Sequence, residues 1–298
     1  MKTWIKAARL RTLPLALSCV VIAAFIAANE GKFSPIIFAF AVLTTVLLQV
    51  LANFANDYGD AMNGADNEDR IGPDRMVQTG AISLDKMRTI IKITIVLTLI
   101  SGIVLLYFSF GSAILSKEFI GLFVLGLLSI IAALKYTAGR NPYGYRALGD
   151  LSVFLFFGLL GVMGNYFLYT QVINYEVLLP AISIGVFSMA VLNLNNMRDR
   201  PTDALVGKNT IPVLLGQNKA KVYHIALLAI GMICAIMYSI RATEGMIKFI
   251  YIIPFFVFVI HAIKVIKTQE SKFFDPELKK VALSTFVFSL LFGIGLII

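Results

Sequence analysis

The sequence contains little charge. Asp, Glu, Lys and Arg make up only 14% of its 298 residues, whereas hydrophobic residues make up 58%. The mean hydropathy is +0.84. Because an ordinary soluble domain is about 25% charged, this composition excludes a typical water-soluble protein. It predicts an integral membrane protein that is surrounded by membrane lipid.

Cysteine and histidine are also scarce. Cys19 and Cys234 both lie in hydrophobic stretches, so the sequence indicates neither a disulfide framework nor a thiolate metal site. His224 and His261 each stand alone, and no cluster of His with Cys indicates haem or zinc. We expect the cysteines to be packing residues and the histidines to be interfacial or hydrogen-bonded within the fold.

Hydrophobic stretches recur along the whole chain. A transmembrane helix needs roughly 17 to 25 largely apolar residues, and the chain has nine such stretches. They are 13–29, 36–55, 90–110, 118–134, 151–169, 177–195, 222–240, 247–263 and 281–298. The first follows a basic segment, as in a signal peptide, but no clear cleavage site follows it, so we expect it to be retained. We therefore predict an all-α, polytopic membrane protein that forms one domain over residues 1–298.

Basic residues are distributed unevenly among the connections. If the N-terminus is cytoplasmic, the loops on the opposite side contain four of the 26 Lys and Arg residues, namely Lys32, Lys117, Arg241 and Lys248. The positive-inside rule therefore predicts a cytoplasmic N-terminus. The net charge of +9 reflects this topology and an attraction to anionic lipid, and we expect no nucleic-acid partner.

Acidic residues are absent from the middle of every hydrophobic stretch, which argues against an ion path through the membrane centre. They concentrate on the predicted cytoplasmic side, after the second and sixth stretches. The first cluster has the spacing i, i+3, i+4, i+7, and the second has i, i+3, i+7. Their members are Asn53, Asn56, Asp57 and Asp60, and Asn196, Asp199 and Asp203. Each spacing places its residues on one side of a helix, and the likeness of the clusters suggests an internal duplication.

Two acidic rows that face one cavity repel each other unless cations lie between them. Asp and Asn oxygens suit Mg²⁺, which is usually bound by a few carboxylates together with substrate phosphates. Nearby basic residues would bind the remaining phosphate oxygens. They are Arg70, Arg75, Arg198, Arg200 and Lys208. We predict a site for a diphosphate bridged by Mg²⁺. The alternative is a set of solvated helix caps and turns, and two clusters with matching spacing favour the site.

A third cytoplasmic loop, at 135–150, is rich in aromatic and charged residues. They are Lys135, Tyr136, Arg140, Tyr143, Tyr145, Arg146 and Asp150. Taken alone, such a loop is more typical of the aromatic and basic belt at a membrane interface. The alternative is the mouth of a site for an aromatic, anionic substrate, with ring faces for stacking and basic residues for a carboxylate.

The two acidic clusters contain recognisable motifs. Asn56-Asp57-Tyr58-Gly59-Asp60 has the form N-D-x-x-D, and Asp199-Arg200-Pro201-Thr202-Asp203 has the form D-x-x-x-D. With these motifs the chain resembles, over nearly its whole length, the intramembrane aromatic prenyltransferases of the UbiA superfamily. Within that superfamily, three longer strings are similar to the 1,4-dihydroxy-2-naphthoate polyprenyltransferases of menaquinone biosynthesis. They are "DRIGPDRMVQTGAIS", "YTAGRNPYGYRALGDLSVFLFFG" and "VLNLNNMRDRPTDALVGKNTIPVLLG".

The resemblance implies a bundle of nine helices with a polar cap on the cytoplasmic side of a bacterial cytoplasmic (inner) membrane. The implied reaction transfers a polyprenyl group from polyprenyl diphosphate to dihydroxynaphthoate, with loss of CO₂ and diphosphate, and forms demethylmenaquinone. Mg²⁺ is the implied cofactor. Two rival functions remain: transfer to another aromatic acceptor such as 4-hydroxybenzoate, and transport of an anionic metabolite. A transporter would place its polar site near mid-membrane, whereas these polar rows lie at the cytoplasmic boundary.

The resemblance also implies roles for individual residues. The implied Mg²⁺ ligands are Asn56, Asp60, Asp199 and Asp203, and the implied catalytic acids are Asp57, Asp60, Asp199 and Asp203. Diphosphate is expected at Arg70, Arg75 and Lys208. The aromatic substrate is expected at Arg11, Asn53, Lys135, Tyr136, Tyr143 and Asn196. Two features depart from the family pattern: Leu10, between Arg9 and Arg11, replaces a frequent proline, and Asp66 is displaced from the spacing of the ubiquinone branch.

Overall fold

The computed structural model describes residues 2–64, 72–242 and 245–298, and these residues form helices and connecting turns without a β-strand. Nine helical segments within these ranges are long and apolar enough to cross a membrane. They are Lys2–Asn29, Pro35–Met62, Leu84–Ala113, Lys117–Lys135, Gly149–Thr170, Tyr175–Leu205, Ile211–Arg241, Ile247–Lys267 and Ser271–Ile297. Each contains or overlaps one predicted stretch, so the all-α, polytopic membrane fold is confirmed.

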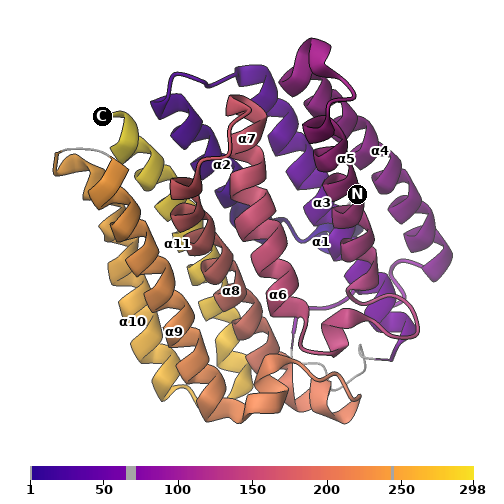
Figure 1. Ribbon diagram of the computed structural model, residues 1–298. Helices are drawn as coiled ribbons and strands as arrows, with labels where there is room; N and C mark the ends of the chain where they lie inside the picture. The colour runs from indigo at the N-terminus through magenta and orange to yellow at the C-terminus, as the bar shows by residue number, and fades with distance from the viewer. Residues whose placement is uncertain (1, 65–71, 243–244) are drawn as a thin grey trace.

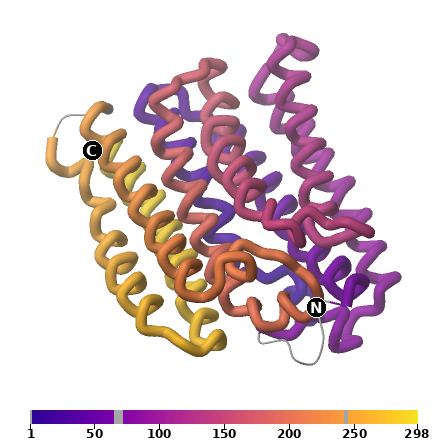
Figure 2. The backbone as a smooth tube through the Cα atoms, turned by 60° about the horizontal axis from the view of Figure 1, so that its bottom comes forward, coloured from indigo at the N-terminus to yellow at the C-terminus, as the bar shows by residue number. Residues whose placement is uncertain are grey.

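The helices lie side by side in one bundle (Figure 1). At one side are α9, α10 and α11, at the other are α4 and α5, and α2, α3 and α8 lie between them (Figures 1 and 2). Their bounds are α2 Leu13–Asn29, α3 Pro35–Met62, α4 Leu84–Phe110, α5 Lys117–Lys135, α8 Leu178–Leu205, α9 Ile211–Ala242, α10 Ile253–Lys267 and α11 Phe274–Ile297. Of the nine segments, the one containing α8 is the most buried.

Local sequence explains where several helices begin. Ser83 precedes α4 and accepts a hydrogen bond from the backbone N–H of Lys86. Ser116 precedes α5 and accepts one from the N–H of Phe119. Pro35 begins α3, at a position where its missing N–H would have no helical partner. These caps satisfy backbone groups that the first turn leaves unpaired.

The first span is broken near its N-terminal end. Helix α1, Lys2–Ala8, is separated from α2 by Arg9, which has the left-handed φ of 49°, and by the short 3₁₀ turn Leu10–Thr12. Hydrogen bonds from helix α3 stabilise the two ends of this break. The Asn53 amide donates to the carbonyl of Ala8 at 2.9 Å and to the Thr12 hydroxyl at 3.1 Å. The break therefore brings both Arg9 and Arg11 to the end of α3 that carries the first acidic motif.

The fifth span changes helical form along its length. It consists of α6 (Gly149–Val153), a π-helical segment (Phe154–Gly164) and α7 (Asn165–Thr170). A Cβ at Gly158 would lie 2.8 Å from the carbonyl oxygen of Ala181 and 2.9 Å from the Cα of Gly185. Small residues are therefore needed where this span crosses α8, as is common where membrane helices approach closely.

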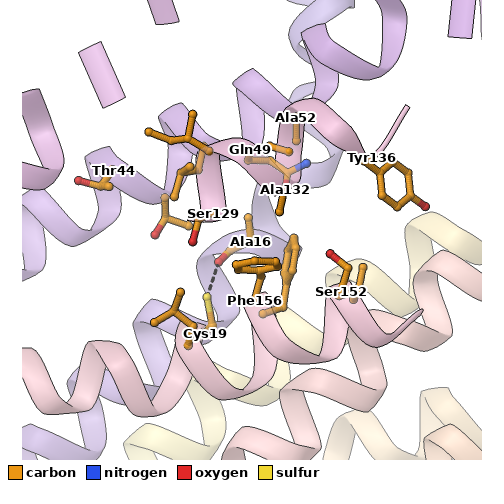
Figure 3. A pocket seen from close by; sticks show the side chains of 18 of the residues that line it. Ala16, Cys19, Thr44, Gln49, Ala52, Ser129, Ala132, Tyr136, Ser152 and Phe156 are labelled. Atoms are coloured by element: carbon orange, nitrogen blue, oxygen red, sulfur yellow. Dashed lines mark hydrogen bonds between the residues drawn. The ribbon is translucent and has the colours of Figure 1, made fainter. Parts of the chain in front are cut away.

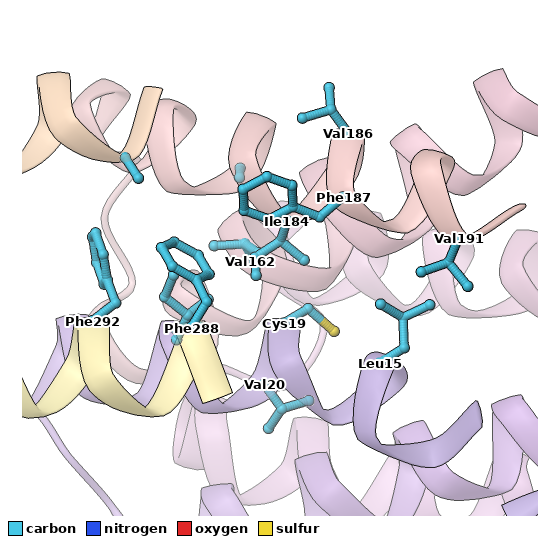
Figure 4. Close-up of a cluster of buried hydrophobic side chains, with 14 of the residues drawn as sticks. Leu15, Cys19, Val20, Val162, Ile184, Val186, Phe187, Val191, Phe288 and Phe292 are labelled. Atoms are coloured by element: carbon cyan, nitrogen blue, oxygen red, sulfur yellow. The ribbon is translucent and has the colours of Figure 1, made fainter. Parts of the chain in front are cut away.

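Aromatic side chains pack α8 against the C-terminal helices (Figure 4). The ring centroids of Phe187 and Phe288 are 5.3 Å apart, and those of Phe288 and Phe292 are 5.5 Å apart. Such contacts gain dispersion energy even where lipid is the alternative surrounding. They fix α11 beside α8, so the start of α11 and the end of α8 lie at a fixed separation.

The two histidines, isolated in the sequence, meet in the structure. Their Nε2 atoms are 2.8 Å apart, and Nδ1 of His261 is 2.7 Å from a carboxylate oxygen of Glu277. Lys264 and Lys280 both contact the other oxygen of Glu277 at 2.7 Å. The expectation that the histidines are hydrogen-bonded within the fold is therefore confirmed. Helix packing joins α9, α10 and α11 through side chains that are far apart in sequence.

Candidate functional site

A cavity of about 420 Å³ lies between the N-terminal and central helices. Figure 3 shows it surrounded by side chains that include Thr44, Gln49, Ser129 and Phe156. Its wall is largely apolar. Contributing residues are Leu105, Leu106, Leu122, Phe123, Phe156, Phe157, Leu160 and Leu168. Polar and charged residues from both motif regions also line it, namely Asn56, Asp60, Arg75, Asn196 and Lys208. The cavity thus joins a charged end to a long apolar space.

Asp60 of the first motif is held by three different segments. Arg75 Nη2 donates to its Oδ2 at 3.1 Å, and the Tyr145 hydroxyl donates to its Oδ1 at 2.9 Å. Lys208 Nζ lies 3.9 Å from the same Oδ1. The carboxylate is 2% exposed, and burial of a charge is costly unless it is paired. These partners satisfy that requirement and place two cations at the charged end of the cavity.

Lys208 connects the two acidic motifs. Its Nζ is 3.4 Å from Oδ1 of Asp203 as well as 3.9 Å from Oδ1 of Asp60. Oδ2 of Asp203 is buried and has no hydrogen-bond partner among the described residues. A buried carboxylate oxygen in this state is expensive and fits an additional cation at the site. The structure therefore brings Asp60, Asp203 and Lys208 together.

Asp199 is bound by its neighbour in sequence. Nε and Nη2 of Arg198 donate to its two oxygens at 2.8 and 2.7 Å. Nη2 also donates to Asn195 at 2.8 Å, and Nη1 forms an ion pair with Asp275. Arg198 was a candidate phosphate ligand in the sequence, but the structure places its guanidinium on these carboxylates.

Asp57 is directed at the loop after α3. Its carboxylate accepts hydrogen bonds from the backbone N–H groups of Met76, at 3.1 Å, and Val77, at 3.2 Å. It is not among the residues that line the cavity. Because Arg75 directly precedes these two residues, Asp57 fixes the backbone that presents the Arg75 guanidinium to Asp60.

Gly59 allows the loop after α5 to approach the first motif. A Cβ at this position would lie 2.6 Å from Oγ1 and 2.7 Å from the carbonyl carbon of Thr137, which is closer than real side chains come. The Thr137 hydroxyl lies 3.2 Å from Oδ1 of Asn56 and 3.1 Å from the carbonyl oxygen of Ala55. The glycine within the motif is thus required by the packing that orients Asn56.

The predicted residues for the aromatic substrate divide into two groups. Arg11, Tyr136, Tyr143 and Asn196 line the cavity, whereas Asn53 and Lys135 do not. Asn53 is instead bonded to the break after α1, and Lys135 is exposed. Burial raises the pKa of the Tyr136 phenol above its ordinary value, as it does for Tyr143, so both remain neutral hydroxyls. Their rings pack edge to face with centroids 5.4 Å apart.

The donor set suits a hard divalent ion, although it does not form a closed cage. Among the residues that the structure describes, no three His, Cys, Asp or Glu side chains gather closely enough to hold a metal alone. Asp60 and Asp203 share Lys208, while Asp199 is bound to Arg198. Mg²⁺ usually keeps several ligands from water and substrate phosphate, so this open arrangement fits an ion that binds together with a diphosphate. Arg70 and Asp66, also considered in the sequence, lie outside the described residues.

Three contributors to the site were missed at the level of sequence. Tyr145 binds Asp60, Thr137 contacts Asn56, and Asp275 pairs with both Arg11 and Arg198. The tyrosine-rich loop was a signal for Tyr145, but it favoured an interfacial belt. Nothing in the sequence pattern points to Asp275, which lies 77 residues from Arg198.

Known proteins resemble this chain in sequence and in fold. The model of the UbiA prenyltransferase family matches residues 16–273. The 1,4-dihydroxy-2-naphthoate octaprenyltransferase of Haemophilus influenzae is 39% identical over 300 residues, which cover 100% of this chain and 96% of the relative. Two solved structures, at 17% and 15% identity, show the fold alone. The apo UbiA homolog of Aeropyrum pernix K1 has a TM-score of 0.70, covering 96% of this chain and 97% of its own. The UbiA homolog of Archaeoglobus fulgidus bound to GPP and Mg²⁺ has a TM-score of 0.64, and the match covers 99% of each chain.

Proposed function

The chain belongs to the UbiA prenyltransferase family, and from this membership we propose that it transfers a polyprenyl group to 1,4-dihydroxy-2-naphthoate. A polyprenyl diphosphate is the donor. The donor's carbon–oxygen bond breaks and diphosphate takes the electron pair. A carbon–carbon bond to the naphthoate ring forms, and the carboxylate leaves as CO₂. The product is demethylmenaquinone in its reduced form, and the proposal takes residues 1–298 as a single catalytic domain.

The observation that carries the proposal is the shape and polarity of the cavity. Its charged end contains Asp60, Arg75 and Lys208, and its wall is apolar. A polyprenyl diphosphate has the same division between a charged head and an apolar tail. The octaprenyltransferase name of the Haemophilus influenzae relative supports a long tail and a naphthoate acceptor.

The charged end is suited to stabilise the leaving diphosphate. Arg75 and Lys208 supply fixed positive charge, and charge that is already in place costs no reorganisation when the bond breaks. Asn56, Asp60, Asp199 and Asp203 would hold Mg²⁺, a role supported by the unpartnered oxygen of Asp203. When bound, Mg²⁺ supplies Lewis-acid charge to the diphosphate oxygens.

The remaining polar residues are suited to the acceptor. Arg11 lines the cavity, and a guanidinium favours a carboxylate geometrically as well as by charge. Tyr136 and Tyr143 line it too, and their neutral rings favour a nearby allylic cation through their π-faces. The apolar wall excludes water, which would otherwise capture that cation.

We further infer that the protein lies in a bacterial cytoplasmic membrane with its N-terminus and charged site on the cytoplasmic side. The support is the uneven distribution of basic residues in the sequence. The diphosphate of the donor and the carboxylate of the naphthoate are both anionic, so these groups would face the aqueous compartment on that side.

The acceptor is tested by comparing two substrates in separate incubations. Membranes that contain the protein are incubated with a labelled polyprenyl diphosphate, Mg²⁺, and either dihydroxynaphthoate or 4-hydroxybenzoate. We expect a labelled lipophilic product only with dihydroxynaphthoate, at a mass that reflects loss of CO₂. Membranes with Asp203→Asn are the control for background transfer. Product from 4-hydroxybenzoate alone would instead assign the chain to a different acceptor.

A further inference from the structure

Four charged side chains form a continuous chain from the cavity to the second motif. Arg11 Nη1 is 3.2 Å from Asp275, Asp275 forms an ion pair with Nη1 of Arg198, and Arg198 donates to both oxygens of Asp199. Arg198 is 1% exposed, whereas Arg11 and Asp275 are 32% and 34% exposed. This row of charged side chains therefore begins at the partly exposed Arg11 and Asp275 and continues to the buried guanidinium of Arg198.

The position of Asp275 is fixed by packing. It lies in the first turn of α11, two residues before Glu277. Glu277 is buried and is bound by His261, Lys264 and Lys280. Together with the aromatic packing of α11 on α8, these contacts hold the start of α11 at a set distance from Arg198. Asp275 is thus a fixed anion, not a mobile surface group.

The fixed anion changes what Arg198 does to Asp199. Arg198 occupies a lone pair on each oxygen of Asp199, and its positive charge opposes a second cation there. Asp275 takes the other edge of the guanidinium and offsets its charge. Among the described residues, Arg198 forms ion pairs with the carboxylates of Asp199 and Asp275. If Asp275 were removed, the whole charge of Arg198 would act on Asp199. Asp199 would then be a poorer ligand for a divalent ion.

We propose that Asp275 is a positioning residue that shares Arg198 and thereby keeps Asp199 available to a divalent cation. This inference rests on the proposed function, in which Asp199 is a Mg²⁺ ligand. Because Arg11 competes with Arg198 for the same carboxylate, the charge on Arg11 also acts on the metal site. An acceptor carboxylate that binds Arg11 would release Asp275 toward Arg198, so acceptor and metal binding reinforce each other, as linkage requires.

The test measures Mn²⁺ binding to the purified full-length protein in the presence of GPP and without an acceptor, from the electron paramagnetic resonance signal of protein-bound Mn²⁺. Asp275→Asn is expected to weaken Mn²⁺ binding about tenfold or more, as is usual when a residue that supports a metal ligand is removed. Asp275→Glu keeps the charge and is expected to recover most of the affinity. Glu270→Gln removes an exposed ion pair with Lys272 in the same region and is expected to change nothing.

A second variant separates positioning from simple structural support. Arg11→Gln removes the competing partner of Asp275, so we expect Mn²⁺ affinity at or above that of the wild type. A structural role for the Arg11–Asp275 pair would instead make both variants lose affinity together with thermal stability. Unchanged affinity in Asp275→Asn, or no Mn²⁺ binding by the wild type, overturns the inference. Wild-type protein that binds Mn²⁺ but transfers no prenyl group overturns the proposed function alone.

Discussion

The hydroxyl of Tyr145 donates a hydrogen bond to Asp60 at 2.9 Å, across 85 residues of sequence. Lys208 Nζ lies 5.2 Å from the centroid of the same ring. Further, the backbone N–H of Asn209 donates to the carbonyl of Tyr145 at 3.0 Å. The tyrosine-rich loop is therefore a connection between the first motif and the segment that carries Lys208, rather than only an interfacial belt.

Tyr145→Phe tests that connection. It removes a hydrogen bond to a charged group, which is worth about 1.5–3 kcal/mol. We expect a fall in kcat/KM of roughly 10- to 100-fold, with a raised Mg²⁺ requirement, measured by prenyl transfer at varied Mg²⁺. Tyr58→Phe is the matched control, since the Tyr58 hydroxyl bonds the exposed Arg88. Equal losses in both variants would contradict a specific role for Tyr145.

Asp57→Asn tests whether Asp57 acts through the loop. The Asn side chain has one carbonyl oxygen, whereas the carboxylate accepts from two backbone N–H groups. We expect faster amide hydrogen exchange at residues 76–80 and a local loss of about 1–3 kcal/mol. Activity should fall through poorer presentation of Arg75. Unchanged exchange with lost activity would instead assign Asp57 a direct role in the reaction.

Gly126→Leu tests the path of the prenyl tail. Gly126 lines the cavity, and no atom lies within 4 Å of a Cβ built there, so a larger side chain enters the space without strain. We expect transfer from the short donor geranyl diphosphate (GPP) to be kept. Transfer from long polyprenyl diphosphates should be lost, as measured by the mass of the product. Gly121→Leu is the control, because Gly121 also has open space but does not line the cavity. An equal loss of prenyl transfer from short and long donors would contradict this path for the tail.

Asp60→Asn and Asp199→Asn test the two motifs separately. Each keeps the shape of the side chain but removes a charge beside a buried guanidinium. We expect loss of prenyl transfer, with the protein still inserted in the membrane. Because breaking a buried ion pair costs about 3–5 kcal/mol, the thermal unfolding of each variant is measured beside its activity. Full activity of purified Asp199→Asn would remove the second motif from the metal site.

The spans and their order follow from hydropathy, because twenty apolar residues have few alternatives to a membrane helix. The helix ends do not. Helices α3 and α8 continue to Met62 and Leu205, well past the predicted ends at 55 and 195. Both motifs are therefore helical, and the polar residues that ended the hydropathy signal extend these helices beyond their apolar stretches.

The candidate site was predictable in part. The clusters identified Asn56, Asp60 and Asn196, which line the cavity. Asn56 and Asp57 are adjacent, however, and adjacent residues on a helix differ by about 100° in direction. In the structure Asn56 lines the cavity, whereas Asp57 is directed to the loop after α3. Tyr145 and Asp275 required the packing of distant segments, which single-sequence patterns do not contain.

The central claim is that the two motifs hold a diphosphate together with Mg²⁺. Its most direct test is prenyl transfer by purified protein that has been treated with EDTA, with labelled polyprenyl diphosphate and dihydroxynaphthoate, as Mg²⁺ is added back. We predict no product before the addition and restored product afterwards, with Asp203→Asn inactive at every Mg²⁺ concentration. Full activity in EDTA, or failure of any divalent ion to restore it, would contradict the account.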